Sequence, residues 1–136
     1  MSQTLASENS ASSVTTGKVL NIVLWVLQLG AAAMFLMAGF SKLSGDPLAV
    51  AGFEQIGLGQ WFRYLTGTLE VTGALALLTP WFSGVGALLL VAVMVGAVAT
   101  HLFVLGGSPL MAILFLVVTA IIAWGRRGRT WRLLGR

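Results

Sequence analysis

The sequence predicts an all-α membrane protein, a four-helix bundle with a short interfacial helix between spans one and two. Of the 136 residues, 57% are hydrophobic and only 9% are charged, and the mean hydropathy is +0.94. A soluble domain carries roughly 25% charged residues, so these few charges could not cover a soluble surface. The apolar residues also gather in long runs, and a helix that is apolar on all sides is stable in a bilayer.

The first predicted span covers residues 19–40 and follows Lys18. The segment before it, residues 1–17, holds eight Ser and Thr residues and has no periodic apolar face, which predicts a disordered tail. A cleaved signal peptide is the alternative for this first run. Its apolar region would span about 7–15 residues, and this run is longer, so we expect it to remain as a span.

A short helix is predicted next, over residues 48–56. Asp46 supplies a side-chain acceptor at the N-cap and Pro47 a fixed φ at the first helical position. The helix is too short to cross a bilayer and carries Glu54, so we expect it at the interface. Glycines at 57 and 59 end it. Aromatic residues then predict a belt at the membrane surface: Trp61, Phe62 and Tyr64.

Three further spans are predicted at about 64–79, 85–105 and 110–124, joined by turns rich in glycine and proline. The two turns between them are short, so successive spans should be antiparallel neighbours. The transmembrane domain is therefore predicted over 18–125. A basic cytoplasmic tail follows over 126–136, whose arginines should contact lipid headgroups: Arg126, Arg127, Arg129, Arg132 and Arg136.

The basic residues also predict the orientation. Lys18 and the five tail arginines flank one side of the spans, whereas Lys42 and Arg63 flank the other. By the positive-inside rule, both termini should be cytoplasmic, in a multi-pass protein of the cell membrane. Because this charge pattern follows membrane topology, the net charge of +4 does not indicate nucleic-acid binding.

The residue types that are missing exclude several kinds of chemistry. The chain has no cysteine, so it can form no disulfide and no thiolate iron–sulfur site. One histidine cannot supply a typical metal site, and the single loop aspartate, Asp46, argues against a Ser-His-Asp triad. We expect no metal, no cofactor bound by the chain alone, and no stand-alone enzyme.

Glu70 is the most informative position, because a carboxyl inside a bilayer must be paired, protonated or hydrated. It shares its helical face with Thr66, Gly67, Gly73 and Ala74, which suits close approach of another helix. A functional carboxylate and a structural lock remain equal alternatives. Gln28, a lone amide in the first span, is interpreted as an interhelical contact.

His101 falls at a depth similar to that of Glu70, since the second and third spans are antiparallel. Lys42 and Arg63 reach the same level, which predicts one polar cluster of four ionisable residues. The alternative is that His101 bonds a backbone carbonyl and Lys42 extends to water.

The pattern resembles the DoxX-like family of small four-helix bacterial membrane proteins. The resemblance is carried by residues 35–43, 53–58, 69–78 and 99–101, and it covers roughly 19–125. It implies a neighbour or subunit of a membrane redox system. On that analogy Lys42, Glu70 and His101 would meet a quinone headgroup or a partner subunit.

Three functions follow from these observations. The leading hypothesis is an accessory subunit of a quinone-linked redox complex, with membrane lipids and other membrane subunits as partners. The second is a small proton-coupled transporter that uses Glu70. The third is a purely structural assembly subunit.

Overall fold

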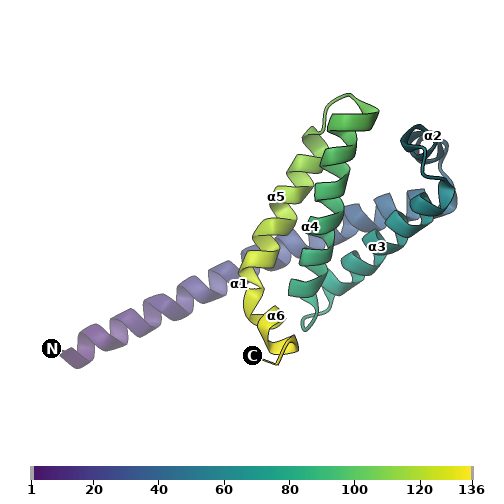
Figure 1. The fold of residues 1–136 in the computed structure, drawn as a ribbon. Helices are drawn as coiled ribbons and strands as arrows, with labels where there is room; N and C mark the ends of the chain where they lie inside the picture. Colours follow the sequence, from purple (N-terminus) through teal and green to yellow (C-terminus); the bar gives the residue numbers. More distant parts are fainter. Residues whose placement is uncertain (1, 136) are drawn as a thin grey trace.

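The computed structural model describes residues 2–135, and their side chains from residue 17 onward, as an all-α protein (Figure 1). Its long helices are α1 (Ser2–Ser44), α3 (Gln60–Leu78), α4 (Ser83–Thr100) and α5 (Leu110–Gly125). Two short helices, α2 (Pro47–Ile56) and α6 (Arg127–Leu133), and a π-helical turn, η1 (His101–Leu105), complete it. Residues 2–135 contain no strand, and the predicted fold class is confirmed.

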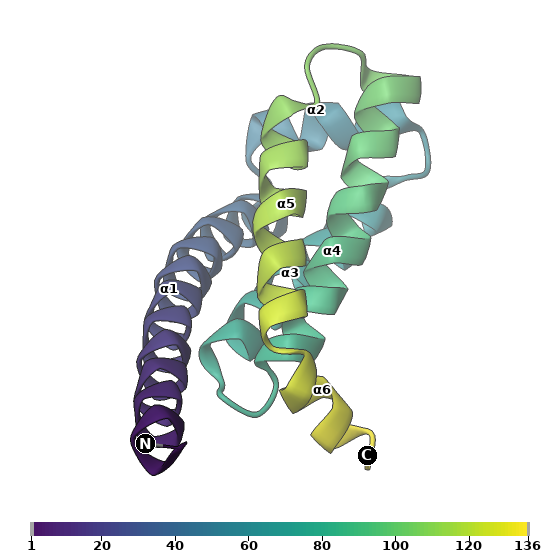
Figure 2. The same cartoon turned by 90° about the vertical axis from the view of Figure 1, so that its left-hand side faces the viewer.

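The four long helices form two antiparallel pairs. α1 packs mainly on α3, and α4 packs on α5 and also on α3. The pairs meet where α3 turns into α4 and diverge toward the end that carries α2 (Figure 1). The view from the side shows α2 crossing behind α4 and α5 at that end (Figure 2). The two pairs are therefore close together at one end and apart at the other, where α2 lies. We call these the closed end and the open end.

The apolar helices are those of a membrane protein. Gly17–Ser44 and Ser83–Leu105 are each long and apolar enough to cross a bilayer. α5 and α6 would pass the same test as one span, but they are bent by 63° with respect to each other. α3 falls outside this set, since polar residues such as Arg63 and Glu70 lower its hydropathy. Large apolar side chains cover much of the described surface, which suits lipid rather than water.

α1 begins at Ser2 and so includes the serine- and threonine-rich segment for which the sequence predicts a disordered tail. This end of α1 projects beyond the rest of the bundle (Figure 1). A helical segment that packs on nothing is marginal in water, whatever its backbone geometry. Disorder of residues 1–17 in water, and with it the predicted tail, thus stays a prediction.

The bounds of α2 agree with the predicted short helix, and Pro47 occupies its first turn. Gly57 ends it in the left-handed conformation, with φ of 82°, which glycine adopts without a steric penalty. One detail of the prediction is wrong. Asp46 is the N-cap residue, but its side chain makes no capping hydrogen bond. Its backbone carbonyl accepts the first helical bond, from the Val50 amide at 2.9 Å.

Small residues bring the helices of the core close together. A Cβ placed on Gly39 of α1 would lie 2.9 Å from the Gly67 carbonyl of α3, and one on Gly86 of α4 would lie 2.6 Å from the Ala76 Cβ. Such contacts are the usual basis of helix packing in membranes. The buried apolar core lies between these contacts and consists of Ala31, Ala32, Phe35, Ala74, Leu77, Ala87, Leu90, Met94 and Ile122.

Candidate functional site

An ion pair joins α1 to α3 inside the bundle. Lys42 Nζ lies 2.9 Å from Glu70 Oε1 and 3.3 Å from Oε2. The Glu70 side chain is 2% exposed, whereas that of Lys42 is 22% exposed. Lys42 thus supplies a counter-charge for a buried carboxylate. Removing one partner of a buried ion pair destabilises a protein by about 3–5 kcal/mol. The predicted convergence of Lys42 and Glu70 is therefore present in the structure.

The glycines around Glu70 explain how the pair can form. Gly67 lies one turn before Glu70, and a Cβ there would meet Lys42 Cβ at 3.0 Å. Gly39 lies one turn before Lys42 and packs on the Gly67 carbonyl. The two backbones thus approach closely at this level, and Lys42 reaches Glu70 without leaving the bundle.

Arg63 is buried in the first turn of α3, two turns before Glu70. Its Nη1 donates to the Lys42 carbonyl, and its Nε donates to Gln60 Oε1 at 2.7 Å. The guanidinium also lies over the Tyr64 ring, 4.3 Å from its centroid. Arg63 therefore belongs to the predicted cluster through the backbone of Lys42. It satisfies the carbonyl of the last turn of α1, which has no helical donor.

His101 lies across the opening from the ion pair, at the start of η1. Its Nδ1 lies 2.9 Å from the Ala97 carbonyl, which is the contact that the second predicted alternative gives His101. The other half of that alternative is absent, because Lys42 pairs with Glu70. Since a carbonyl only accepts, Nδ1 carries a proton, and in the neutral ring Nε2 is then an acceptor. Among the described residues, no hydrogen bond links His101 to Glu70 or Lys42.

A cavity of about 750 Å³ connects these groups. It lies where the two helix pairs diverge, and α2 borders it through Leu48, Phe53 and Ile56. Lys42, Glu70 and His101 all line it, whereas Arg63 does not. Three small residues of α4 also line this cavity: Ala92, Gly96 and Thr100. The walls are otherwise mainly apolar, and the volume is within the range of about 300–1,000 Å³ typical of small-molecule sites.

A second polar cluster lies at the closed end of the bundle. Gln28, fully buried on α1, donates from Nε2 to the Leu77 carbonyl at 2.7 Å and accepts from Arg126 Nε at 2.6 Å. Arg126 Nη1 also donates to Asn21 Oδ1 at 2.9 Å. Gln28 therefore has the interhelical role that the sequence predicts, linking α1, α3 and the end of α5.

Arg126 differs from its predicted place at the lipid headgroups. It is 6% exposed and points into the bundle, because Gln28 and Asn21 supply acceptors there. The other described tail arginines lie at the surface or near it. Arg127 covers Trp124, Arg129 donates to the Pro80 carbonyl, and Arg132 is exposed. Arg136 lies outside the described residues.

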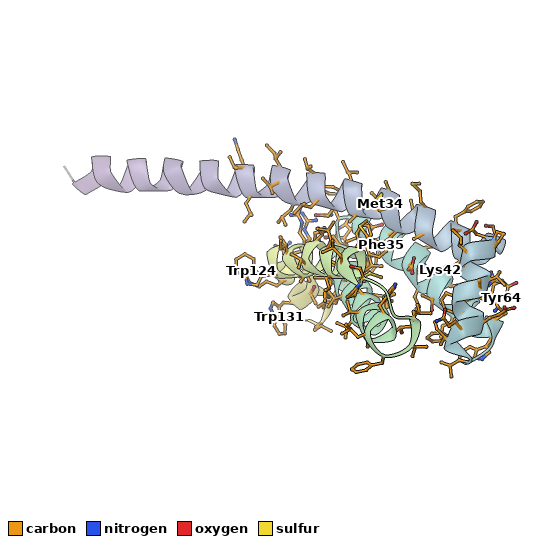
Figure 3. The ribbon with its side chains drawn as sticks, turned by 90° about the horizontal axis from the view of Figure 1, so that it is seen from above. Met34, Phe35, Lys42, Tyr64, Trp124 and Trp131 are labelled. Carbon is orange, nitrogen blue, oxygen red and sulfur yellow. The ribbon has the colours of Figure 1, made fainter. Side chains whose placement is uncertain are left out.

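The two clusters occupy opposite ends of the molecule. Figure 3 shows Lys42 and Tyr64 at one end, and Trp124 and Trp131 at the other. Within the described residues, no group of three or more His, Cys, Asp and Glu side chains could hold a metal ion. The open end thus offers an apolar cavity with one ion pair and one imidazole.

Comparison with known proteins places these features in a family. The model of the DoxX-like family matches residues 26–125, about three quarters of the chain. The chain belongs to the DoxX-like family. It is also 33% identical over 107 residues to YdgD, an uncharacterized protein of Bacillus subtilis (strain 168). That alignment covers 74% of this chain and 94% of its relative. No solved structure matches the chain significantly.

The DoxX-like region contains the whole cavity and its ionisable residues, from α1 to α5. It stops at Gly125, so Arg126 and α6 follow it. Sequence reasoning missed Asn21 and the inward turn of Arg126. The sequence did hold a signal for this second cluster. Asn21 and Gln28 are polar residues in an apolar span, and their spacing of seven residues places them on one face of α1.

Proposed function

We propose that this DoxX-like protein is a multi-pass subunit of a redox complex in the cell membrane, with both termini cytoplasmic. The observation that carries the proposal is the mainly apolar cavity of about 750 Å³ with Lys42, Glu70 and His101 on its wall. The chain has no cysteine and one histidine, so electron transfer would depend on partner subunits.

The ligand that fits this cavity best is the headgroup of a quinone. Its ring and tail would contact apolar walls, and a carbonyl could accept from the Lys42 ammonium. The tautomer of His101 that bonds Ala97 leaves Nε2 as an acceptor, which suits the hydroxyl of a reduced quinone. Glu70, beside Lys42, is placed to take up or release a proton.

A structural assembly subunit is the second candidate, and the Lys42–Glu70 pair favours it. The carboxylate already has a partner at 2.9 Å, and Arg63 binds the backbone of that partner. The same pairing gives less support to proton exchange by a transporter, in which Glu70 would have to be released. In the structural role, the cluster holds α1 on α3 and needs no ligand.

Purification from native membranes in mild detergent, followed by mass spectrometry, tests the accessory role. We expect stoichiometric redox subunits; a partner-free oligomer would contradict the proposal. Quinone turnover of the purified complex then separates the two candidates. If Glu70 relays a proton, Glu70→Gln should lower turnover about a hundredfold, the lower end for acid–base groups.

The matched control is Glu54→Gln, since Glu54 is exposed on α2 and does not line the cavity. His101→Ala should also lower turnover. If Glu70→Gln lowers only thermal stability, and the assembled complex turns over normally, the structural role holds instead.

A further inference from the structure

A small pocket lies at the closed end of the bundle, between the α3–α4 turn and α6. It has a volume of about 250 Å³ and is lined by Pro80, Trp81, Arg129, Arg132 and Leu133. Arg129 Nη1 donates to the Pro80 carbonyl at 2.9 Å and to Ser83 Oγ at 3.2 Å. These two bonds hold its guanidinium at the wall of the pocket. Arg132 comes from the next turn of α6, and its side chain makes no hydrogen bond to the described residues.

The charge at this end is not compensated by the described part of the chain. From residue 17 to 135, the acidic residues are Asp46, Glu54 and Glu70, and all lie in or near the open end. Within residues 17–135, the one ion pair joins Lys42 and Glu70. Arg126 has a buried Nη2 without a hydrogen bond in the same part of the chain, so even the inward arginine is only partly satisfied. A cluster of this kind favours an external anion.

The surroundings of the pocket indicate which anion. Trp81 is 70% exposed and lines it, and Trp124 and Trp131 are exposed at the same end. Exposed tryptophans mark the headgroup level of a bilayer. Leu133 and Trp81 give the pocket apolar sides beside the two guanidinium groups. Arginine pairs well with phosphate oxygens because its planar fork can donate two hydrogen bonds.

We propose that this pocket is a specific site for the phosphate of one anionic phospholipid. Arg129 and Arg132 bind the phosphate, while Trp81 and Leu133 contact the glycerol and the first acyl carbons. The site is separate from the cavity of the open end, so it can exist whether or not a quinone binds there. It would tie the α3–α4 turn to α6 at the membrane surface.

Native mass spectrometry of the full chain, released from micelles with equal phosphatidylglycerol and phosphatidylcholine, tests the site. We expect one phosphatidylglycerol to be retained in preference. Arg132→Gln should lower that retention about fivefold, the effect of one basic residue near anionic lipid. Arg127→Gln is the matched control, because it removes the same charge from an exposed arginine outside the pocket.

Arg129→Gln should lower lipid retention further, but it also removes the bonds to Pro80 and Ser83 and can disturb the pocket itself. Arg132→Gln is therefore the variant that tests the site. Equal losses in Arg132→Gln and Arg127→Gln would indicate general charge attraction and overturn the site. Displacement of the lipid by millimolar inorganic phosphate would show a site for free phosphate, which would also overturn the lipid assignment.

Discussion

Two polar residues inside the bundle are satisfied in different ways. Glu70 depends on one cation, Lys42, which is itself partly exposed. Gln28 uses both ends of its amide, one toward α3 and the other toward Arg126. The Gln28 amide is held by two hydrogen bonds, so its position is fixed. The Glu70 carboxylate has one flexible partner, Lys42, which another hydrogen-bond donor can replace. We therefore expect the Lys42–Glu70 pair of the open end to rearrange, and the hydrogen bonds of Gln28 at the closed end to keep the helices in place.

Gln28→Leu should destabilise the protein in detergent by about 2–3 kcal/mol, because hydrogen bonds to charged groups contribute about 1.5–3 kcal/mol. The change leaves the Leu77 carbonyl without its side-chain donor and the buried Arg126 Nε without its acceptor. Thermal unfolding followed by circular dichroism measures it. Asn21→Leu is the control, since it removes one bond from a more exposed position and should cost less. If Gln28→Leu unfolds at the same temperature as the unchanged protein, the two hydrogen bonds of Gln28 do not stabilise the bundle.

The sequence placed Lys42 and Glu70 in one predicted cluster, since a carboxylate stands out in an apolar span and a cation at a similar depth ends the previous span. The inward turn of Arg126 could not be predicted in the same way. Its direction depends on the rotation of α5 about its axis and on the bend into α6, and neither leaves a local sequence signal. The hydrogen bond of His101 to Ala97 was one of two alternatives, which helical spacing could not separate.

At the scale of elements, helix ends with local signals were predicted well. Pro47 and Gly57 bound α2 as expected, and the predicted third span of 85–105 matches the end of η1. The change from α-helix to π-helix at His101 was not predicted, since no residue type requires it. α6 was expected as a tail, because its arginines suggested headgroup contact, although arginine and leucine also favour helix.

The contact of α1 with α3 should depend on Gly39. An added methyl there would meet the Val71 Cγ2 at 2.6 Å and the Gly67 carbonyl at 2.9 Å, so the helices must separate. Gly39→Ala should therefore destabilise the protein by about 1–3 kcal/mol, the usual cost of overpacking. Because Lys42 lies one turn away, its pairing with Glu70 should weaken as well. The unfolding temperature in detergent measures the first effect.

Gly30→Ala is the matched control, because Gly30 is in the same helix and has nothing within 4 Å of the added Cβ. It should be neutral or stabilising by up to about 1 kcal/mol, the difference in helix propensity. If both variants unfold at the same temperature, close approach at Gly39 does not hold α1 on α3.

For the whole molecule, the two ends differ in how their cations are used. At the open end, Lys42 pairs with Glu70 and Arg63 binds backbone and Gln60. At the closed end, the described arginines that form side-chain hydrogen bonds have neutral acceptors, and none has a described carboxylate as a partner. The bond between Arg126 and Asn21 keeps the start of the apolar part of α1 beside the C-terminal segment. The surplus of positive charge is thus on one side, and the proposed orientation places that side in the cytoplasm.

Single-cysteine labelling can test this orientation cleanly, because the chain contains no cysteine. Leu58→Cys places a thiol at an exposed position of the open end, and Gly128→Cys places one at the closed end, where the added Cβ meets nothing within 4 Å. A membrane-impermeant maleimide on intact cells should label the first variant and not the second. Both should react once the membrane is permeabilised, which controls for thiol access. Labelling of Gly128→Cys in intact cells would reverse the orientation, and it would place the arginine pocket in the outer leaflet.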